Sequence, residues 1–221
     1  MPILYHIANS LVLPPAMFFA YNFYKFRKSD IDFTKFRITI CIVSLTLAVS
    51  TIQFIFPAII PVLDRNKEAL LSGQAWRLIS PLFIQPGGLW QCFFNGLFFI
   101  MFLPLGEYLY GRRILLLYFG TGIIGQLILF YWGTGLRGGS STSLYGVMGA
   151  FFMYIVLNRA AFPRAYIIIP IAGFTGAVML CFFKDGHAPP LLFAGVLALA
   201  LRRHTRTIPG NKEFYKENIV Q

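Results

Sequence analysis

Long apolar runs separated by short charged clusters are the feature that most constrains the fold of this chain. Several runs reach the roughly 20 residues that a helix needs to cross the hydrocarbon core of a bilayer. Only 12% of the 221 residues are charged and 57% are hydrophobic, whereas a soluble domain usually carries about twice that charged fraction. Backbone groups in lipid must be satisfied internally, so such runs cross as helices. The sequence therefore predicts an all-α polytopic membrane protein.

Seven apolar segments organise the chain. The first is the weakest because His6, Asn9 and the pair Pro14-Pro15 interrupt it, so it either spans with a kink or lies along the interface. The segments are Ile3–Tyr24, Ile38–Leu63, Leu89–Leu105, Ile114–Trp132, Ser141–Asn158, Ala165–Phe183 and His187–Leu201. We expect residues 1–37 to form an N-terminal hydrophobic segment and basic connection, residues 38–201 one membrane domain, and residues 202–221 a basic cytoplasmic tail.

The basic residues give the chain an orientation. If the six strong segments all span, fourteen of the 19 lysines and arginines fall on one side, including the tail, and five on the other. Cytoplasmic connections carry the excess of Lys and Arg, so the first side is predicted to be cytoplasmic. The same distribution accounts for the net charge of +11. We therefore expect the lipid bilayer as a partner and no nucleic acid.

Cys41, Cys92 and Cys181 lie in apolar runs without metal-ligand spacing, so neither a metal nor a cofactor is expected. His187 opens the last segment, and an ionisable residue at the edge of a span is a functional candidate. On position alone, a histidine wetted by headgroups at a helix end explains it equally well.

A second polar concentration runs from Gly138 to Gly146 and includes Ser141. Taken alone, it is better explained as a capped and tightly packed helix start. The topology changes this balance, because Ser141 and His187 both begin spans that enter from the non-cytoplasmic side. A serine needs a nearby base to become a nucleophile, and a neutral imidazole is the usual one.

Gln91 and Asn95 form a third polar group. They are four residues apart, which puts both amides on one helix face. Amide donors near a serine stabilise the oxyanion of acyl transfer by about 3 kcal/mol each. When the serine is left aside, hydrogen bonding between packed spans explains the pair better.

Together these residues resemble the rhomboid family of intramembrane serine proteases. The resemblance runs in order from Gly73 to Leu201. It includes the external pair Trp76-Arg77, the amides Gln91 and Asn95, the turn from Glu107 to Arg113, the helix start at Gly139-Ser140-Ser141 with Leu144 to Gly149, and His187.

The resemblance implies a rhomboid-like six-helix core, which leaves Ile3–Tyr24 as a possible extra N-terminal helix. It implies Ser141 as nucleophile and His187 as general base, forming a dyad with no third carboxylate. Its oxyanion hole would use Gln91, Asn95 and the Ser141 amide. Orienting or structural roles fall to Tyr145, Trp76, Arg77, Glu107 and Gly139. The implied substrates are single-pass transmembrane proteins cut near the non-cytoplasmic face, and a cell (inner) membrane is favoured over an organelle membrane.

Two other interpretations stay open. Thr142, where many relatives have Gly, and Pro190, where a small residue is usual, suggest an inactive rhomboid-like protein that binds membrane helices. A small transporter is the less favoured alternative, since no acidic residue lies in mid-span.

Overall fold

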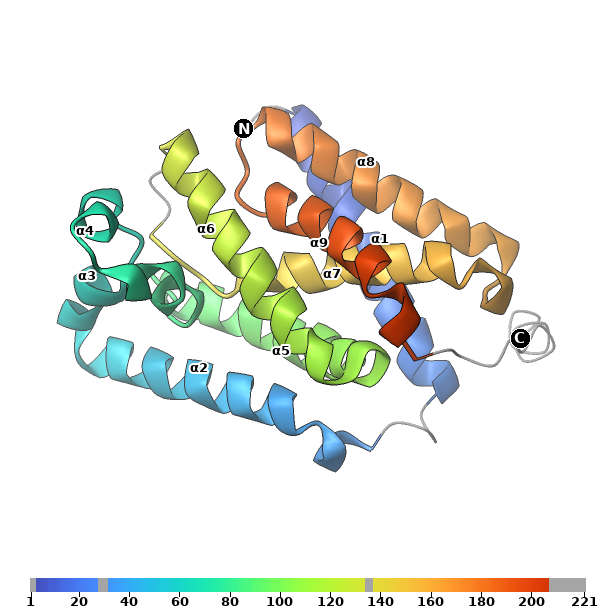
Figure 1. Ribbon diagram of the computed structural model, residues 1–221, viewed down its shortest axis with the longest axis horizontal. Helices are drawn as coiled ribbons and strands as arrows, with labels where there is room; N and C mark the ends of the chain where they lie inside the picture. The colour runs from blue at the N-terminus through green and yellow to red at the C-terminus, as the bar shows by residue number, and fades with distance from the viewer. Residues whose placement is uncertain (1–2, 28–31, 134–136, 207–221) are drawn as a thin grey trace.

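Helix α7 (Ser141–Leu157) is the central element of the computed structural model (Figure 1). It is apolar on all sides and buried along nearly its whole length, as expected of a helix surrounded by others. Four helices pack around it: α5 (Gly88–Tyr110), α6 (Thr121–Trp132), α8 (Ile168–Phe182) and α9 (Ala188–Ala200). The structure describes residues 3–27, 32–133 and 137–206.

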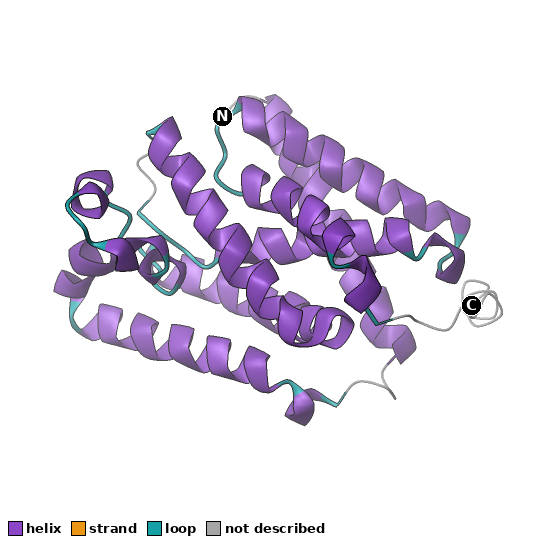
Figure 2. Ribbon diagram, in the orientation of Figure 1, coloured by secondary structure: helices purple, strands orange, loops and turns teal. Residues whose placement is uncertain are grey.

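Two further long helices lie at the periphery. α1 (Ile3–Arg27) packs on α8, and α2 (Arg37–Ile55) packs on α5. The connection from α2 to α5 holds the short helices α3 (Ile60–Leu63) and α4 (Lys67–Leu71). Regular elements in the described ranges are all helical (Figure 2). Besides the α-helices there are a π-helical stretch at Leu116–Gly120 and 3₁₀ turns at Phe33–Lys35, Pro57–Ile59, Ala75–Leu78, Ser80–Leu82, Gly111–Arg113, Arg159–Ala161, Arg164–Ile167 and Arg202–His204.

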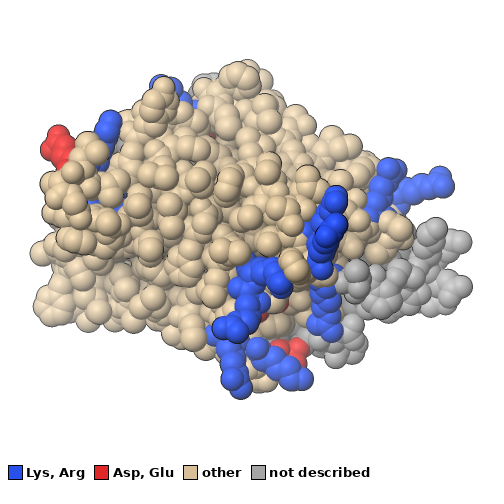
Figure 3. Space-filling view, in the orientation of Figure 1, with Lys and Arg blue, Asp and Glu red and all other residues tan. Residues whose placement is uncertain are grey.

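The prediction of an all-α membrane protein is confirmed. Four helices in the described part of the chain, α1, α2, α5 and α8, are long and apolar enough to cross a bilayer, and three shorter apolar helices accompany them. Large hydrophobic side chains are exposed along α2, α5 and α8. Figure 3 shows a broad band without charge and a cluster of Lys and Arg toward one end of the molecule. This distribution is the one that a bilayer requires.

The predicted segment Ile38–Leu63 is not one helix. α2 ends at Ile55, and Phe56 leaves the helical region because a residue before proline is disfavoured there, with Pro57 following. The first segment, in contrast, is a single helix despite Pro14 and Pro15.

A close approach fixes α1 against α8. The buried side of α1 is a stripe of six residues at helical spacing: Ala8, Val12, Ala16, Phe19, Ala20 and Phe23. A Cβ placed on Gly176 of α8 would lie 2.6 Å from the carbonyl oxygen of Ala8. Small residues allow helices to pack this closely in a membrane. α1 is therefore a packed helix of spanning length.

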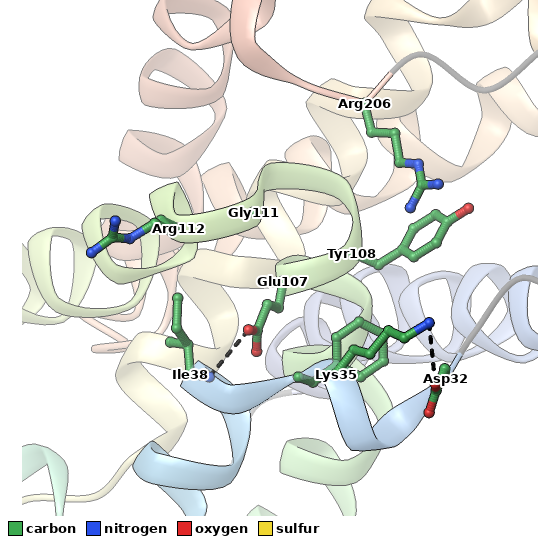
Figure 4. A pocket seen from close by; sticks show the side chains of 9 residues that line it. Asp32, Lys35, Ile38, Glu107, Tyr108, Gly111, Arg112 and Arg206 are labelled. Carbon is green, nitrogen blue, oxygen red and sulfur yellow. Dashed lines mark hydrogen bonds and ion pairs between the residues drawn. The ribbon is translucent and has the colours of Figure 1, made fainter.

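Glu107 joins the end of α5 to the start of α2. Its carboxylate accepts hydrogen bonds from the backbone amides of Ile38 (3.1 Å) and Thr39 (2.7 Å), where a negative charge also suits the helix dipole (Figure 4). A pocket of about 410 Å³ opens here, lined by Asp32, Lys35, Phe36, Ile38, Glu107, Tyr108, Gly111, Arg112 and Arg206.

The start of the predicted tail docks on this end of the molecule. The Arg206 amide donates to the Leu109 carbonyl at 2.8 Å, and the Tyr154 hydroxyl donates to the Arg206 carbonyl at 2.8 Å. The remainder of the tail, residues 207–221, lies outside the described residues.

The closest helix contact gives a first prediction. A Cβ on Gly149 of α7 would overlap the backbone carbonyl of Leu191 in α9, whereas one on Gly96 of α5 would meet nothing within 4 Å. We expect Gly149→Ala to reduce the free energy of unfolding by about 1–3 kcal/mol, because the two helices must separate. Thermal unfolding in detergent measures this, with Gly96→Ala as the matched control. Equal melting temperatures for the two variants would contradict the close contact.

Labelling tests the orientation. In a variant with Cys41, Cys92 and Cys181 replaced by Ala, Ile3→Cys and Leu71→Cys should react with a membrane-impermeant maleimide from the same, non-cytoplasmic side. Lys35→Cys should react only from the other side, because α1 crosses between residues 3 and 35. Reaction of Ile3→Cys together with Lys35→Cys would exclude a spanning α1.

Candidate active site

Ser141 and His187 meet at one end of the helix bundle. Ser141 is the first residue of α7, and His187 immediately precedes α9. The Ser141 Oγ lies 2.9 Å from the His187 Nε2, a hydrogen-bond distance. The His187 side chain is 27% exposed, so the pair is accessible without being freely solvated. Figure 1 shows the starts of α7 and α9 at the same end of the molecule.

The chain before Ser141 is shaped by Gly139. Gly139 has a φ of 142°, and a Cβ there would overlap the Gln91 side chain, so both conformation and space require glycine. Its amide donates to the Pro81 carbonyl at 2.8 Å. The amides in the first turn of a helix have no intrahelical partner. The Ser141 amide is one of these, which makes it a hydrogen-bond donor at the site.

His187 is held from its other ring nitrogen by Asp185. Oδ1 of Asp185 lies 2.7 Å from the His187 Nδ1 and also accepts the His187 backbone amide at 2.8 Å. Oδ2 accepts the Tyr5 hydroxyl at 2.7 Å. Burial alone would raise the pKa of Asp185, but the hydrogen bonds and charge of His187 and the Tyr5 hydroxyl outweigh burial and lower this pKa to about 2. The structure thus differs from the expectation of no third carboxylate.

Tyr145 packs on the imidazole. Its ring centroid lies 4.4 Å from that of His187, with an angle of 34° between the planes. Tyr145 is four residues after Ser141, one helical turn along α7, so the same helix presents the serine and the aromatic surface. The ring plane of His187 is therefore restrained from one side by Tyr145.

The side-chain amide of Gln91 contacts the segment just before Ser141, and that of Asn95 is joined to Ser140 through Gln85. The Gln91 Nε2 donates to the Gly138 carbonyl at 3.2 Å, and its Oε1 accepts the Gly87 amide at 2.6 Å. The Asn95 Nδ2 donates to the Gln85 Oε1 at 2.7 Å. Each side-chain amide has two N–H donors, so each retains one for a ligand.

Gln85 was missed in the sequence. It is 1% exposed and its Nε2 donates to the Ser140 Oγ at 3.0 Å, so it joins Asn95 to the residue before Ser141. Gln53 of α2 in turn pairs with both backbone groups of Gln85, each at 2.7 Å. Two glutamines in otherwise apolar stretches are the signal that could have revealed this buried network.

Trp76 and Arg77 belong to the connection before α5. Arg77 is buried and its Nη1 contacts the Pro61 carbonyl, the Asp64 carbonyl and the Asp64 carboxylate at 2.8–3.0 Å. Trp76 is 51% exposed, and its indole donates to the Val62 carbonyl at 3.4 Å. Arg77 therefore stabilises the fold of the connection, while most of the Trp76 side chain faces outward.

Thr142 and Pro190 fit into the helix packing. A Cβ on Gly125 of α6 would overlap the Thr142 methyl group and lie 3.3 Å from Pro190, so the missing side chain of Gly125 leaves the space that both residues occupy. The distance of 2.9 Å between Ser141 and His187 is reached with both residues present.

Comparisons with known proteins agree with this geometry. Residues 72–198 match the Rhomboid domain family. The chain is 26% identical over 155 residues to the putative rhomboid protease YdcA of Bacillus subtilis (strain 168), an alignment that covers 65% of this chain and 77% of that protein. No solved structure matches the chain. Since the family match spans more than half of its residues, from the connection that carries Arg77 to the helix after His187, the chain belongs to the rhomboid family.

Proposed function

We propose that this protein is an intramembrane serine endopeptidase with Ser141 as nucleophile and His187 as general base. The observation that carries the proposal is the 2.9 Å contact between the Ser141 Oγ and the His187 Nε2. A nucleophile and a base within hydrogen-bond reach, the base held by a further group, form the signature of an activated serine. Membership of the rhomboid family supports the same activity.

In the proposed reaction, the Ser141 Oγ attacks the scissile carbonyl carbon while its proton moves to the His187 Nε2. The tetrahedral intermediate collapses as His187 returns the proton to the leaving amine, which leaves an acyl ester on Ser141. A water molecule, deprotonated by His187, then attacks the ester carbonyl; the bond to the Ser141 Oγ breaks as His187 returns the proton to this oxygen, which releases the second product and restores the free serine. The partial exposure of His187 provides access for water.

The negative oxygen of each intermediate requires donors. The Ser141 amide, with the free amide hydrogens of Gln91 and Asn95, is proposed to form the oxyanion hole. The start of α7 adds the positive end of its helix dipole. The bonds from Gln91 to Gly138 and from Asn95 to Gln85 hold these amides in place before substrate binds. Preorganised donors of this kind avoid reorganisation during the reaction.

The proposed substrates are single-pass transmembrane proteins. The site lies at the end of the bundle opposite the basic cluster, so cleavage is proposed near the non-cytoplasmic face. A transmembrane helix must unwind locally to present a carbonyl to Ser141, which favours segments with small or helix-breaking residues. We further propose a cell membrane as the location, supported by the relative from a bacterium.

A second candidate is an inactive protein that binds membrane helices. It was motivated by Thr142 and Pro190, which Gly125 accommodates. The hydrogen-bonded Ser141 and His187 therefore favour the protease.

Cleavage of a model transmembrane substrate in liposomes tests the proposal. Ser141→Ala and His187→Ala should each lower kcat by about 10³-fold or more, because each removes one half of a unit that acts together. Ser72→Ala is the matched control, since Ser72 is exposed in the external connection and should cut like the wild type.

A serine-directed fluorophosphonate probe gives an independent reading of the same site. Labelling should require both Ser141 and His187 and should be unaffected by Ser72→Ala. A folded wild type that neither cuts nor reacts with the probe would support the inactive protein instead.

Removing a donor tests the oxyanion hole. Gln91→Met keeps the length of the side chain but loses both N–H groups, and we expect kcat to fall about 10- to 1,000-fold with KM changed less than threefold. Thermal unfolding of the same variant measures how much stability is lost with the bond to Gly138, so that a fall in kcat is not mistaken for unfolding. An unchanged kcat would remove Gln91 from the proposed hole.

A further inference from the structure

The carboxylate of Asp185 is saturated with donors. It accepts the His187 ring, the His187 backbone amide and the Tyr5 hydroxyl within 2.7–2.8 Å. The Asp185 side chain is only 7% exposed. A carboxylate in such surroundings stays ionised at any pH at which an ordinary imidazole is neutral. A fixed negative charge therefore lies directly behind His187 as seen from Ser141.

The backbone leaves Asp185 little freedom. Lys184, just before it, has a φ of 52°, a left-handed conformation that turns the chain sharply at the end of α8. The Asp185 amide donates to the Leu180 carbonyl at 3.1 Å, and its own carbonyl accepts the Ala188 amide at 3.2 Å. Asp185 is thus held between the end of α8 and the start of α9, at the point from which its side chain reaches the imidazole.

This contact determines which nitrogen of His187 carries the proton. A carboxylate only accepts hydrogen bonds, so the Nδ1 facing Asp185 must be protonated and the Nε2 facing Ser141 must have a free lone pair. That tautomer is the one a general base requires. The same negative charge stabilises the imidazolium formed when the Ser141 proton is transferred.

Tyr5 brings a helix from outside the matched domain into the site. The family match begins at residue 72, whereas Tyr5 lies in the first turn of α1. Its hydroxyl bonds to the Asp185 Oδ2, and its ring packs edge-on against Phe183, with 5.7 Å between centroids. The close approach of α1 to Gly176 of α8 holds this register, because Ala8, one turn after Tyr5, is in that contact.

We propose that Asp185 and Tyr5 are positioning residues of the active site, so that α1 forms part of the catalytic unit. Asp185 holds His187 in the tautomer that serves Ser141, and Tyr5 fixes the second carboxylate oxygen of Asp185. This inference rests on the proposed serine protease function. It adds a carboxylate and an N-terminal helix to the Ser141–His187 pair.

The competing explanation is that Asp185 only caps the start of α9 through the His187 backbone amide. An asparagine fulfils that role as well, since its carbonyl oxygen accepts the same bonds. The capping explanation predicts that Asp185→Asn has the activity of the wild type. The positioning role predicts a folded but slow enzyme, because Asn lacks the charge that stabilises the imidazolium.

The kinetic arm compares four variants on a transmembrane substrate. We expect Asp185→Asn to lower kcat about 100-fold with KM within threefold. Tyr5→Phe should lower kcat about fivefold, because the charge of Asp185 remains but its orientation is less fixed. The matched controls are Asp32→Asn, an exposed carboxylate in the pocket far from the site, and Tyr21→Phe, an exposed tyrosine on α1; both should equal the wild type. Wild-type kcat for Asp185→Asn would overturn the proposal.

The spectroscopic arm does not depend on activity. The chain has three histidines, so ¹⁵N-histidine NMR resolves His187 once His6→Gln and His204→Gln identify the other signals. At about pH 8.5, where an ordinary imidazole is neutral, the wild type and Asp185→Asn should have the proton on Nδ1. Asp185→Ala, which loses the acceptor, should shift the proton toward Nε2.

These two arms separate the proposals. A wild-type His187 protonated on Nε2 would overturn the positioning role whether or not the protein cuts. An Nδ1 proton that depends on Asp185, in a protein without cleavage or probe labelling, would support the placement of Asp185 and reject the protease function. Thermal unfolding of each variant verifies that the compared proteins are folded.

Discussion

The close contact between α7 and α9 is the constraint on which the site depends. Gly149 lies against the backbone carbonyl of Leu191, so no side chain separates the two helices at this point. Both helices start at the same end of the bundle. Because they are packed this closely, the Oγ of Ser141, the first residue of α7, lies 2.9 Å from the Nε2 of His187, the residue before α9. In a membrane no hydrophobic force presses helices together, so packing of small residues and interhelical hydrogen bonds must supply the attraction. Serine and histidine are therefore positioned by the same contact that holds the core together.

Close to the start of α7, a set of buried polar side chains is joined by hydrogen bonds. Gln53 holds the backbone of Gln85, and Gln85 joins Asn95 to Ser140. Unpaired polar groups inside a membrane protein cost several kcal/mol, which keeps such a network in one arrangement. The network comes from four separate parts of the chain: α2, the connection before α5, α5 itself, and the residue before α7. Under the proposed function, this network holds the Asn95 side chain so that its second amide hydrogen is available to the oxyanion.

The sequence predicted the parts of this molecule that depend on hydropathy, charge count and helix starts. The six strong segments and the meeting of Ser141 and His187 follow from apolar length and from the side on which each span begins. The end of α2 at Ile55 was placed too late, because the apolar run continues through Pro57 although the helix does not. Asp185 was visible two residues before His187, but nothing in the spacing indicated that its carboxylate turns back to the ring. That depends on the left-handed backbone of Lys184, a conformation uncommon for a residue other than glycine. Tyr5 was beyond reach because its partner lies 180 residues away.

The contact between α1 and Asp185 extends the candidate site beyond the residues that match the Rhomboid domain. A domain defined by residues 72–198 contains Ser141, His187 and Asp185, yet the second oxygen of Asp185 is filled from the N-terminal helix. α1 packs on α8 through a stripe of buried residues, and Tyr5 lies on the same helix. α8 leads directly into the turn that holds Asp185, so both partners of the Tyr5–Asp185 bond depend on the same interface. Under the proposed function, the packing of α1 on α8 and the orientation of His187 are therefore linked by the hydrogen bond between Tyr5 and Asp185.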